Sequence, residues 1–135
     1  MIQVSHLTKR YGDLTAVDDF SFDVQPGEIV GLIGPNGAGK TSTLRCLVGI
    51  QRPTSGTVTI GGHDILPSPV EAKRHLAFMA DEPHLFEYLT VSEHLQLTAG
   101  IYGVRDLEPK AAALLDELEL TAKKDALPGE LSRGM

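Results

Sequence analysis

Hydrophobic residues alternate with polar ones in the first part of the chain and recur at helical spacing in the last part. The alternation is clearest at 20–24, and the short segments 2–7 and 57–60 have the same strand-like character. This period of two predicts a sheet with one face in water. The run at 28–33 is almost continuously apolar, which is typical of a strand buried on both faces.

Helical spacing appears at 41–48, which predicts a helix that stops at Gly49, and it dominates from Thr90 onward. Thr90 and Glu93 have the spacing of a capping box, so one helix is expected to begin here and to end at Gly103. A second helix is expected to follow. The apolar faces comprise Leu95, Thr98, Ile101 and Tyr102 in the first of these helices and Leu114, Leu115 and Leu118, after Pro109, in the second.

The composition narrows the classes of partner and the compartment. The chain has 135 residues and a net charge of −6, with no run of Lys and Arg that could neutralise a duplex, so no nucleic acid is expected as a partner. The one cysteine, Cys46, cannot form an internal disulfide and is expected to serve packing. No charged and apolar leader precedes Ile2 and no apolar stretch is long enough to span a membrane, which predicts a cytoplasmic protein.

The strongest chemical signal is the pattern G-x-x-x-x-G-K-S/T at 34–41, which chance produces in about half a percent of chains of this length. Its residues are Gly34, Pro35, Asn36, Gly37, Ala38, Gly39, Lys40 and Thr41. The glycines let the backbone approach a polyphosphate, the helix dipole favours an anion, Lys40 adds a positive charge and Thr41 a hydroxyl for Mg²⁺. The pattern predicts a nucleoside triphosphate site; the alternative is a glycine-rich turn with a solvated lysine.

Further segments in a fixed order resemble the nucleotide-binding subunit of ABC transporters over essentially the whole chain. They are Tyr11, 34–42, 53–56, 82–83, 89–91 and 131–135. The last resembles the LSGGQ signature but departs from it at Arg133 and Met135. Asp81, where the family usually has glutamine, together with Gly134 and Met135, is similar to the exporter branch.

The resemblance implies an α/β fold: a P-loop NTPase core with an N-terminal antiparallel β-subdomain and a helical subdomain, truncated before the Walker B strand. The β-subdomain and the P-loop core would interleave over 1–89, and the helical subdomain would occupy 90–135 and end in the signature. The subunit would bind ATP and Mg²⁺, pair head to tail with a second ABC ATPase subunit, and drive transmembrane permease subunits. It would be cytoplasmic and peripheral to the inner or plasma membrane through the permease.

The resemblance also assigns roles to single residues. Tyr11 would stack on adenine, Thr41 and Asp81 would contact Mg²⁺, and Ser132 and Gly134 would face the nucleotide of a partner subunit. The nucleotide-binding set is then Tyr11, Gly34, Pro35, Asn36, Gly37, Ala38, Gly39, Lys40, Thr41, Ser42, Ser132 and Gly134. Tyr11, Ser132 and Asp81 each also have an interpretation without a ligand. Tyr11 would be a surface residue before a turn, Ser132 a helix N-cap, and Asp81 part of a solvated acidic turn. In that turn Glu82 would precede Pro83, leaving His84 and Phe86 exposed to a partner.

The catalytic residues of the family are missing from this stretch. Its members use a second apolar strand that ends in Asp-Glu and a histidine further on, and neither follows within the 135 residues. Asp81, the residue at the glutamine position, does not replace them. The stretch alone is therefore expected to bind Mg·ATP at best weakly and not to turn it over. The remaining alternatives are a soluble ABC-type ATPase of DNA repair or translation and a non-catalytic nucleotide-binding interaction module.

Overall fold

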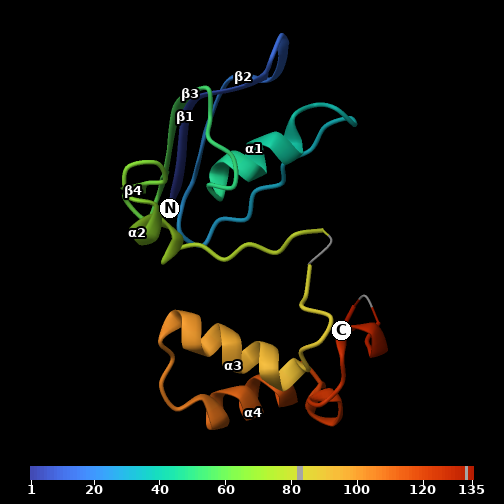
Figure 1. Ribbon diagram of the computed structural model, residues 1–135. Helices are drawn as coiled ribbons and strands as arrows, with labels where there is room; N and C mark the ends of the chain where they lie inside the picture. Colours follow the sequence, from blue (N-terminus) through green and yellow to red (C-terminus); the bar gives the residue numbers. More distant parts are fainter. Residues whose placement is uncertain (82–83, 133) are drawn as a thin grey trace. The chain divides into compact units, whose positions relative to one another are not determined.

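The computed structural model describes residues 1–81, 84–132 and 134–135, and these fall into two compact units (Figure 1). The first unit is Met1–Met79 and the second is Ala80–Met135. The interpretations that rest on Glu82, Pro83 and Arg133 lie outside the described residues. No helix in the described part of the chain is long and apolar enough to cross a lipid bilayer.

The first unit is built on a four-stranded antiparallel sheet with the order β2-β1-β3-β4. Its strands are β1 (Ile2–Tyr11), β2 (Leu14–Val24), β3 (Ser55–Ile60) and β4 (His63–Asp64). The strands predicted at 2–7, 20–24 and 57–60 are confirmed, and two of them are much longer than the sequence pattern indicated. In β2 the partly buried Phe20, Phe22 and Val24 alternate with exposed neighbours, as a sheet with one wet face requires.

An irregularity in the hairpin of β1 and β2 explains a break in the alternation of β1. Val4 and Leu7 are both fully buried although they are three residues apart, which a regular strand would place on opposite faces. The register of the pair shifts between these two residues, and His6 and Asp19 there have positive φ angles of 53° and 45°. Such a bulge turns Leu7 back to the face that Val4 occupies.

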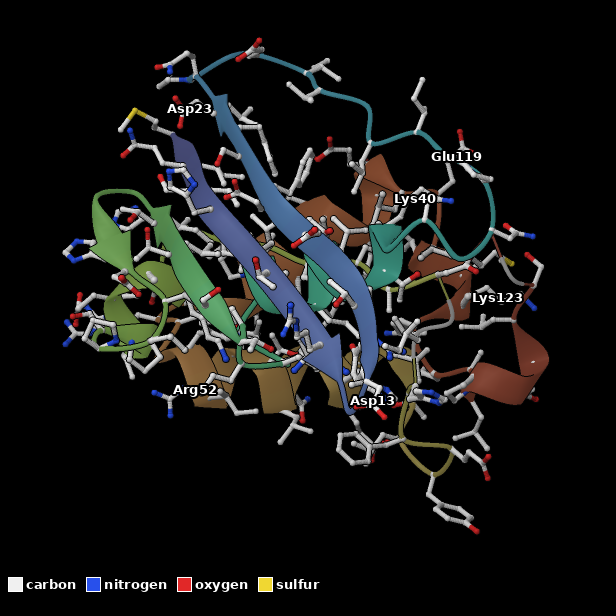
Figure 2. The ribbon with its side chains drawn as sticks, turned by 90° about the horizontal axis from the view of Figure 1, so that it is seen from above. Asp13, Asp23, Lys40, Arg52, Glu119 and Lys123 are labelled. Carbon is white, nitrogen blue, oxygen red and sulfur yellow. The ribbon has the colours of Figure 1, made fainter. Side chains whose placement is uncertain are left out.

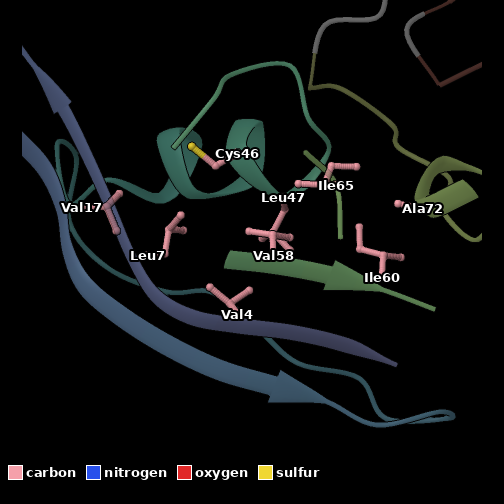
Figure 3. Close-up of a cluster of buried hydrophobic side chains, with 9 residues drawn as sticks. All are labelled: Val4, Leu7, Val17, Cys46, Leu47, Val58, Ile60, Ile65 and Ala72. Carbon is pink, nitrogen blue, oxygen red and sulfur yellow. The ribbon is translucent and has the colours of Figure 1, made fainter. Parts of the chain in front are cut away.

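One face of the sheet carries the core (Figure 3). Helix α1 (Lys40–Leu47) and the short helix α2 (Pro69–Lys73) contribute to the core together with the strands. The buried cluster comprises Val4, Leu7, Val17, Cys46, Leu47, Val58, Ile60, Ile65 and Ala72. The prediction that Cys46 serves packing is confirmed, and its burial raises the pKa of the thiol, an effect that the charge of Lys9 opposes.

The strand predicted at 28–33 was wrong. These residues, all described, form no strand, and Ile29 and Ile33 are 99% and 92% exposed. Residues 78–80, just before Asp81, also form no strand, and Met79 is 89% exposed. A continuously apolar segment forms a strand only where neighbouring strands pair with it and other residues pack on both of its faces. No described strand pairs with 28–33 or with 78–80.

The second unit is a helical hairpin followed by two short 3₁₀ turns. Its elements are α3 (Val91–Tyr102), α4 (Leu107–Glu117), η1 (Thr121–Lys123) and η2 (Pro128–Glu130). The capping box is confirmed: the amide of Glu93 donates to the Thr90 hydroxyl, and the Thr90 amide donates to the Glu93 carboxylate at 2.7 Å. Gly103, in the left-handed conformation, ends α3 as predicted.

The buried stripes of these helices are narrower than the sequence indicated. Ala99 and Leu115 are buried, whereas the predicted face residues Ile101 and Tyr102 in α3 are largely exposed, as is Leu118 after α4. Leu114 is also exposed. Two helices bury only the stripes that face each other, so the flanks of each apolar face stay in water.

Candidate functional site

The glycine loop predicted to bind phosphate leads directly into α1. Gly37 and Gly39 both have φ of 83°, and Gly39 is the N-cap of the helix, which begins at Lys40. Left-handed residues in such a loop turn backbone N–H groups into a concave nest that suits an anion. The first turn of α1 contains no acidic residue, so the positive end of the helix dipole is not neutralised there.

Gly39 lies directly against the backbone of β2. A Cβ atom built at Gly39 would lie 2.1 Å from the Ala16 carbonyl oxygen and 3.1 Å from Cγ2 of Val17. At Gly34 a Cβ would lie 3.2 Å from that of Ala38, and Gly34 does not have a positive φ. The two glycines therefore serve close approach at different points, and Gly39 fixes where the loop contacts the sheet.

Lys40 folds back over the loop that precedes it. Its ammonium donates hydrogen bonds to the carbonyl oxygens of Gly34 at 2.6 Å and Pro35 at 2.7 Å. Figure 2 shows Lys40 at the point where the loop enters α1. Thr43, one turn further, is buried and its hydroxyl donates to the Gly39 carbonyl at 3.0 Å, which ties the helix to the loop. A positive charge is thus held at the mouth of the loop.

A pocket of about 270 Å³ lies on the sheet side of the loop. It is lined by Ala16, Val17, Asp18, Phe20, Leu32, Ile33, Ala38, Lys40 and Thr43. Residues of both the phosphate loop and β2 line this pocket, and the sequence motif alone does not indicate that β2 takes part.

Tyr11, predicted to stack on adenine, ends β1 beside the same helix. Its hydroxyl bonds to the Gln51 side-chain oxygen and lies 3.2 Å from the Ser42 hydroxyl. The ammonium of Lys9 lies 5.0 Å from the centre of the ring. The structure therefore brings Tyr11 to the helix that carries Lys40 and Thr41, although 31 residues separate Tyr11 from Ser42 in sequence.

A magnesium ion at this site would have few protein ligands. No group of three or more His, Cys, Asp and Glu side chains in the described residues could hold a metal ion by itself. Mg²⁺ in nucleotide sites usually keeps several waters and takes one or two protein oxygens together with substrate phosphates. The exposed Thr41 at the start of α1 is an oxygen donor of this kind, so the site fits an ion carried in by a nucleotide.

The other predicted site residues lie in the second unit. Asp81 precedes the helical hairpin, and Ser132 and Gly134 lie close to Met135. The Met135 amide donates a hydrogen bond to the Ser132 carbonyl at 3.1 Å.

Sequence reasoning missed Lys9, Ala16 and Gln51. None of them belongs to the glycine motif, and each reaches the site through the sheet or the loop after α1. The signal for Lys9 was its spacing of two residues from Tyr11, since positions i and i+2 share one face of a strand. Nothing local to Ala16 or Gln51 in the sequence could have indicated their positions.

A glycine loop with left-handed residues, a lysine at the first position of the following helix and a sheet behind them define a P-loop nucleotide-binding unit. The family model described as ABC transporter matches residues 17–135. The chain therefore belongs to the ABC transporter ATP-binding family, and its α/β fold is that of the family's P-loop cassettes.

Individual relatives agree. The chain is 40% identical over 136 residues to the SkfA peptide export ATP-binding protein SkfE of Bacillus subtilis (strain 168), covering 99% of this chain and 56% of the relative. A solved ATP-binding subunit of an ABC transporter matches with a TM-score of 0.89 and 34% identity, over 100% of this chain and 57% of that one. A dimeric bacterial ABC transporter cassette matches with a TM-score of 0.83 and 25% identity, over 98% of this chain and 64% of that one. The chain thus spans between 56% and 64% of the length of these three proteins.

Proposed function

We propose that this chain is the Mg·ATP-binding part of the motor of an ABC exporter. The observation that carries the proposal is the loop at 34–41 with Lys40 at the first position of α1 and Tyr11 beside the same helix. The phosphates bind to the loop amides and the ammonium of Lys40, and the base stacks on the ring of Tyr11. Thr41 is the residue of this unit proposed to hold Mg²⁺, which would neutralise phosphate charge.

Binding requires a change of partners at Lys40. The ammonium that now contacts the carbonyls of Gly34 and Pro35 turns to the phosphates, which are stronger acceptors because they are charged. Ser42 and the small residues of the loop complete the contacts with the triphosphate. This exchange is local to the loop and α1 and leaves the buried core in place.

The wider assembly is proposed by analogy with the relatives. A solved cassette that resembles this chain is dimeric, and a relative is named for peptide export. We propose a head-to-tail dimer in which Ser132 and Gly134 close on the nucleotide of the partner subunit, and permease subunits that carry the movement across the membrane. The interleaved β-subdomain and P-loop core at 1–89 would bind ATP, and the helical subdomain at 90–135 would carry the signature.

Hydrolysis needs a general base within hydrogen-bond reach of the attacking water. We assign no catalytic base among these 135 residues, and Asp81 at the position of the family glutamine is not given that role. The chain by itself is proposed to bind Mg·ATP without turning it over. Sustained phosphate release by the purified chain, at a rate that Lys40→Ala abolishes, would contradict this part of the proposal.

The test is Lys40→Ala, with Lys110→Ala as a control of equal charge. Lys110 lies in α4 of the second unit, where its ammonium donates to the Arg105 carbonyl. Loss of a charge-assisted interaction of about 1.5–3 kcal/mol lowers ATP affinity roughly 10- to 150-fold. Calorimetric titration with Mg·ATP should show this loss for Lys40→Ala and little change for Lys110→Ala.

Thr41→Val tests the metal separately. Valine keeps the branched shape but removes the hydroxyl, so the difference in ATP affinity with and without Mg²⁺ should shrink while binding of metal-free ATP persists. Equal affinities of the original chain, Lys40→Ala and Lys110→Ala would rule out the phosphate site, and an unchanged Mg²⁺ dependence in Thr41→Val would remove Thr41 from the metal site.

A further inference from the structure

The hydroxyl of Tyr11 is held at a junction of two other segments. It bonds to the side-chain oxygen of Gln51, which can only accept, so the single hydroxyl hydrogen of Tyr11 goes to Gln51. Ser42 then donates its own hydrogen to the Tyr11 oxygen across 3.2 Å. The end of the ring is therefore fixed both to the helix that follows the phosphate loop and to the segment after that helix.

One face of the ring is covered by a cation. The ammonium of Lys9 lies 5.0 Å from the ring centre and donates a hydrogen bond of 2.8 Å to the carbonyl of Arg52. Arg52 follows Gln51, so one short segment holds both the hydroxyl and the cation. Tyr11 nevertheless remains 42% exposed, so a large part of its surface is open to a ligand.

We propose that Lys9 and Gln51 are positioning residues that hold Tyr11 as a one-sided stacking platform for the base of a nucleoside triphosphate. This inference rests on the proposed function, since it needs the phosphates at Lys40 and the base at Tyr11. Ser42 links the platform to α1, so the ring and the phosphate loop keep a fixed separation. The base occupies the ring face opposite Lys9.

The physical gain is preorganisation. A ring that is free to rotate loses side-chain entropy when a base stacks on it, whereas a ring fixed at its hydroxyl and on one face has already lost most of that freedom. Stacking on an aromatic face is tolerant of base identity, so the platform favours any purine and does not select adenine. Lys9 and Gln51 thus affect the affinity for the base and not the affinity for the phosphates.

The test compares Mg·ATP with inorganic tripolyphosphate, which has the phosphates but no base. The variants are Lys9→Met, which keeps the length and removes the charge, and Gln51→Leu, which removes the acceptor. Arg10→Met is the matched control, because Arg10 is the neighbouring exposed cation on β1. Lys9→Met should lower the ratio of ATP to tripolyphosphate affinity about two- to fivefold, as an exposed cation–π contact predicts.

Gln51→Leu should lower the same ratio about two- to tenfold, and Gln51→Glu, which keeps an acceptor, should restore most of it. Lys9→Arg, which keeps a cation over the ring, should keep the ratio as well. Arg10→Met should change both affinities by the same factor. If Gln51→Leu does not fold by circular dichroism, Gln51→Ser replaces it, since serine is too short to reach the hydroxyl.

Two failures are distinguishable. If Tyr11→Ala leaves the ratio unchanged, the base does not stack on Tyr11, and that part of the proposed function is wrong. If Tyr11→Ala lowers the ratio but Lys9→Met and Gln51→Leu leave it as it was, the platform exists and the positioning roles are overturned. A loss in Lys9→Met that Lys9→Arg does not restore would also remove the role of the cation.

Discussion

Replacing Gly39 by alanine should damage the phosphate loop far more than the same change at Gly37. Both glycines have φ of 83°, so an alanine at either position carries the same backbone strain, roughly 1–2 kcal/mol. Their surroundings differ. A Cβ at Gly39 would lie 2.1 Å from the Ala16 carbonyl oxygen, whereas nothing lies within 4 Å of one at Gly37.

The additional cost at Gly39 follows from that contact. Cβ atoms essentially never approach another heavy atom within 3.0 Å, and the neighbour here is a backbone carbonyl and not the end of a flexible side chain. Forced overpacking of this kind costs about 1–3 kcal/mol. We therefore expect Gly39→Ala to lower the free energy of unfolding by about 2–5 kcal/mol and Gly37→Ala by about 1–2 kcal/mol.

The assay is urea unfolding followed by far-ultraviolet circular dichroism, with Mg·ATP titration of each folded variant. Gly39→Ala should also reduce ATP affinity at temperatures where it is folded, because α1 and Lys40 move away from β2 when the loop shifts. Equal losses of unfolding free energy in the two variants would refute the reasoning. Both variants carry the same backbone strain, so equal losses would mean that the contact with the Ala16 carbonyl adds nothing at Gly39.

Three further outcomes are expected. The hydrogen bonds from the Thr90 backbone amide, and then from its hydroxyl, lower the pKa of Glu93 below its ordinary 4.5, so the capping box is intact above that pH and is lost as the pH falls through the lowered pKa. Circular dichroism should show α3 fraying as the pH falls below the ordinary pKa of 4.5, and Glu93→Gln should remove this dependence on pH. Cys46 is fully buried with a raised pKa, so a thiol reagent should modify it only as fast as the unit opens, and urea should accelerate the reaction. Ile29 is exposed, so Ile29→Thr should change the free energy of unfolding by no more than about 0.5 kcal/mol and should reduce self-association in light scattering. Leu7 is buried, so Leu7→Ala should lower the free energy of unfolding by about 2–5 kcal/mol. Comparable losses in the two variants would contradict the assignment of the core.

Local signals predicted the parts of the fold that local interactions determine. The capping box of Thr90 and Glu93, the glycine at the end of α3 and the start of α1 depend on a few neighbouring residues, and the structure confirms them. The bulge that places Leu7 beside Val4 depends on left-handed conformations at His6 and on the opposite strand, which no window of β1 encodes. Long-range register was therefore beyond the sequence pattern.

The apolar run at 28–33 shows the opposite error. An apolar composition of this kind favours a strand that is packed on both faces, and the described residues do not bury this segment or pair with it. The same holds for the flanks of the helical hairpin at Ile101 and Leu118. A hydrophobic pattern predicts a requirement for burial, and only packing decides whether that requirement is met.

The phosphate loop has two left-handed glycines and leads into α1 although no described strand pairs with the segment before it, and its contacts with the sheet lie on the side of β1 and β2. Gly39 lies against Ala16 in β2, and Tyr11 at the end of β1 bonds to α1 at Ser42. Both contacts come from the hairpin of β1 and β2, whose strands are paired along most of their length. The motif is usually interpreted as strand, loop and helix; here the hairpin holds the loop and the helix in place. Substitutions in the hairpin at Ala16 or Tyr11 should therefore disturb nucleotide binding more than polar substitutions at Ile29.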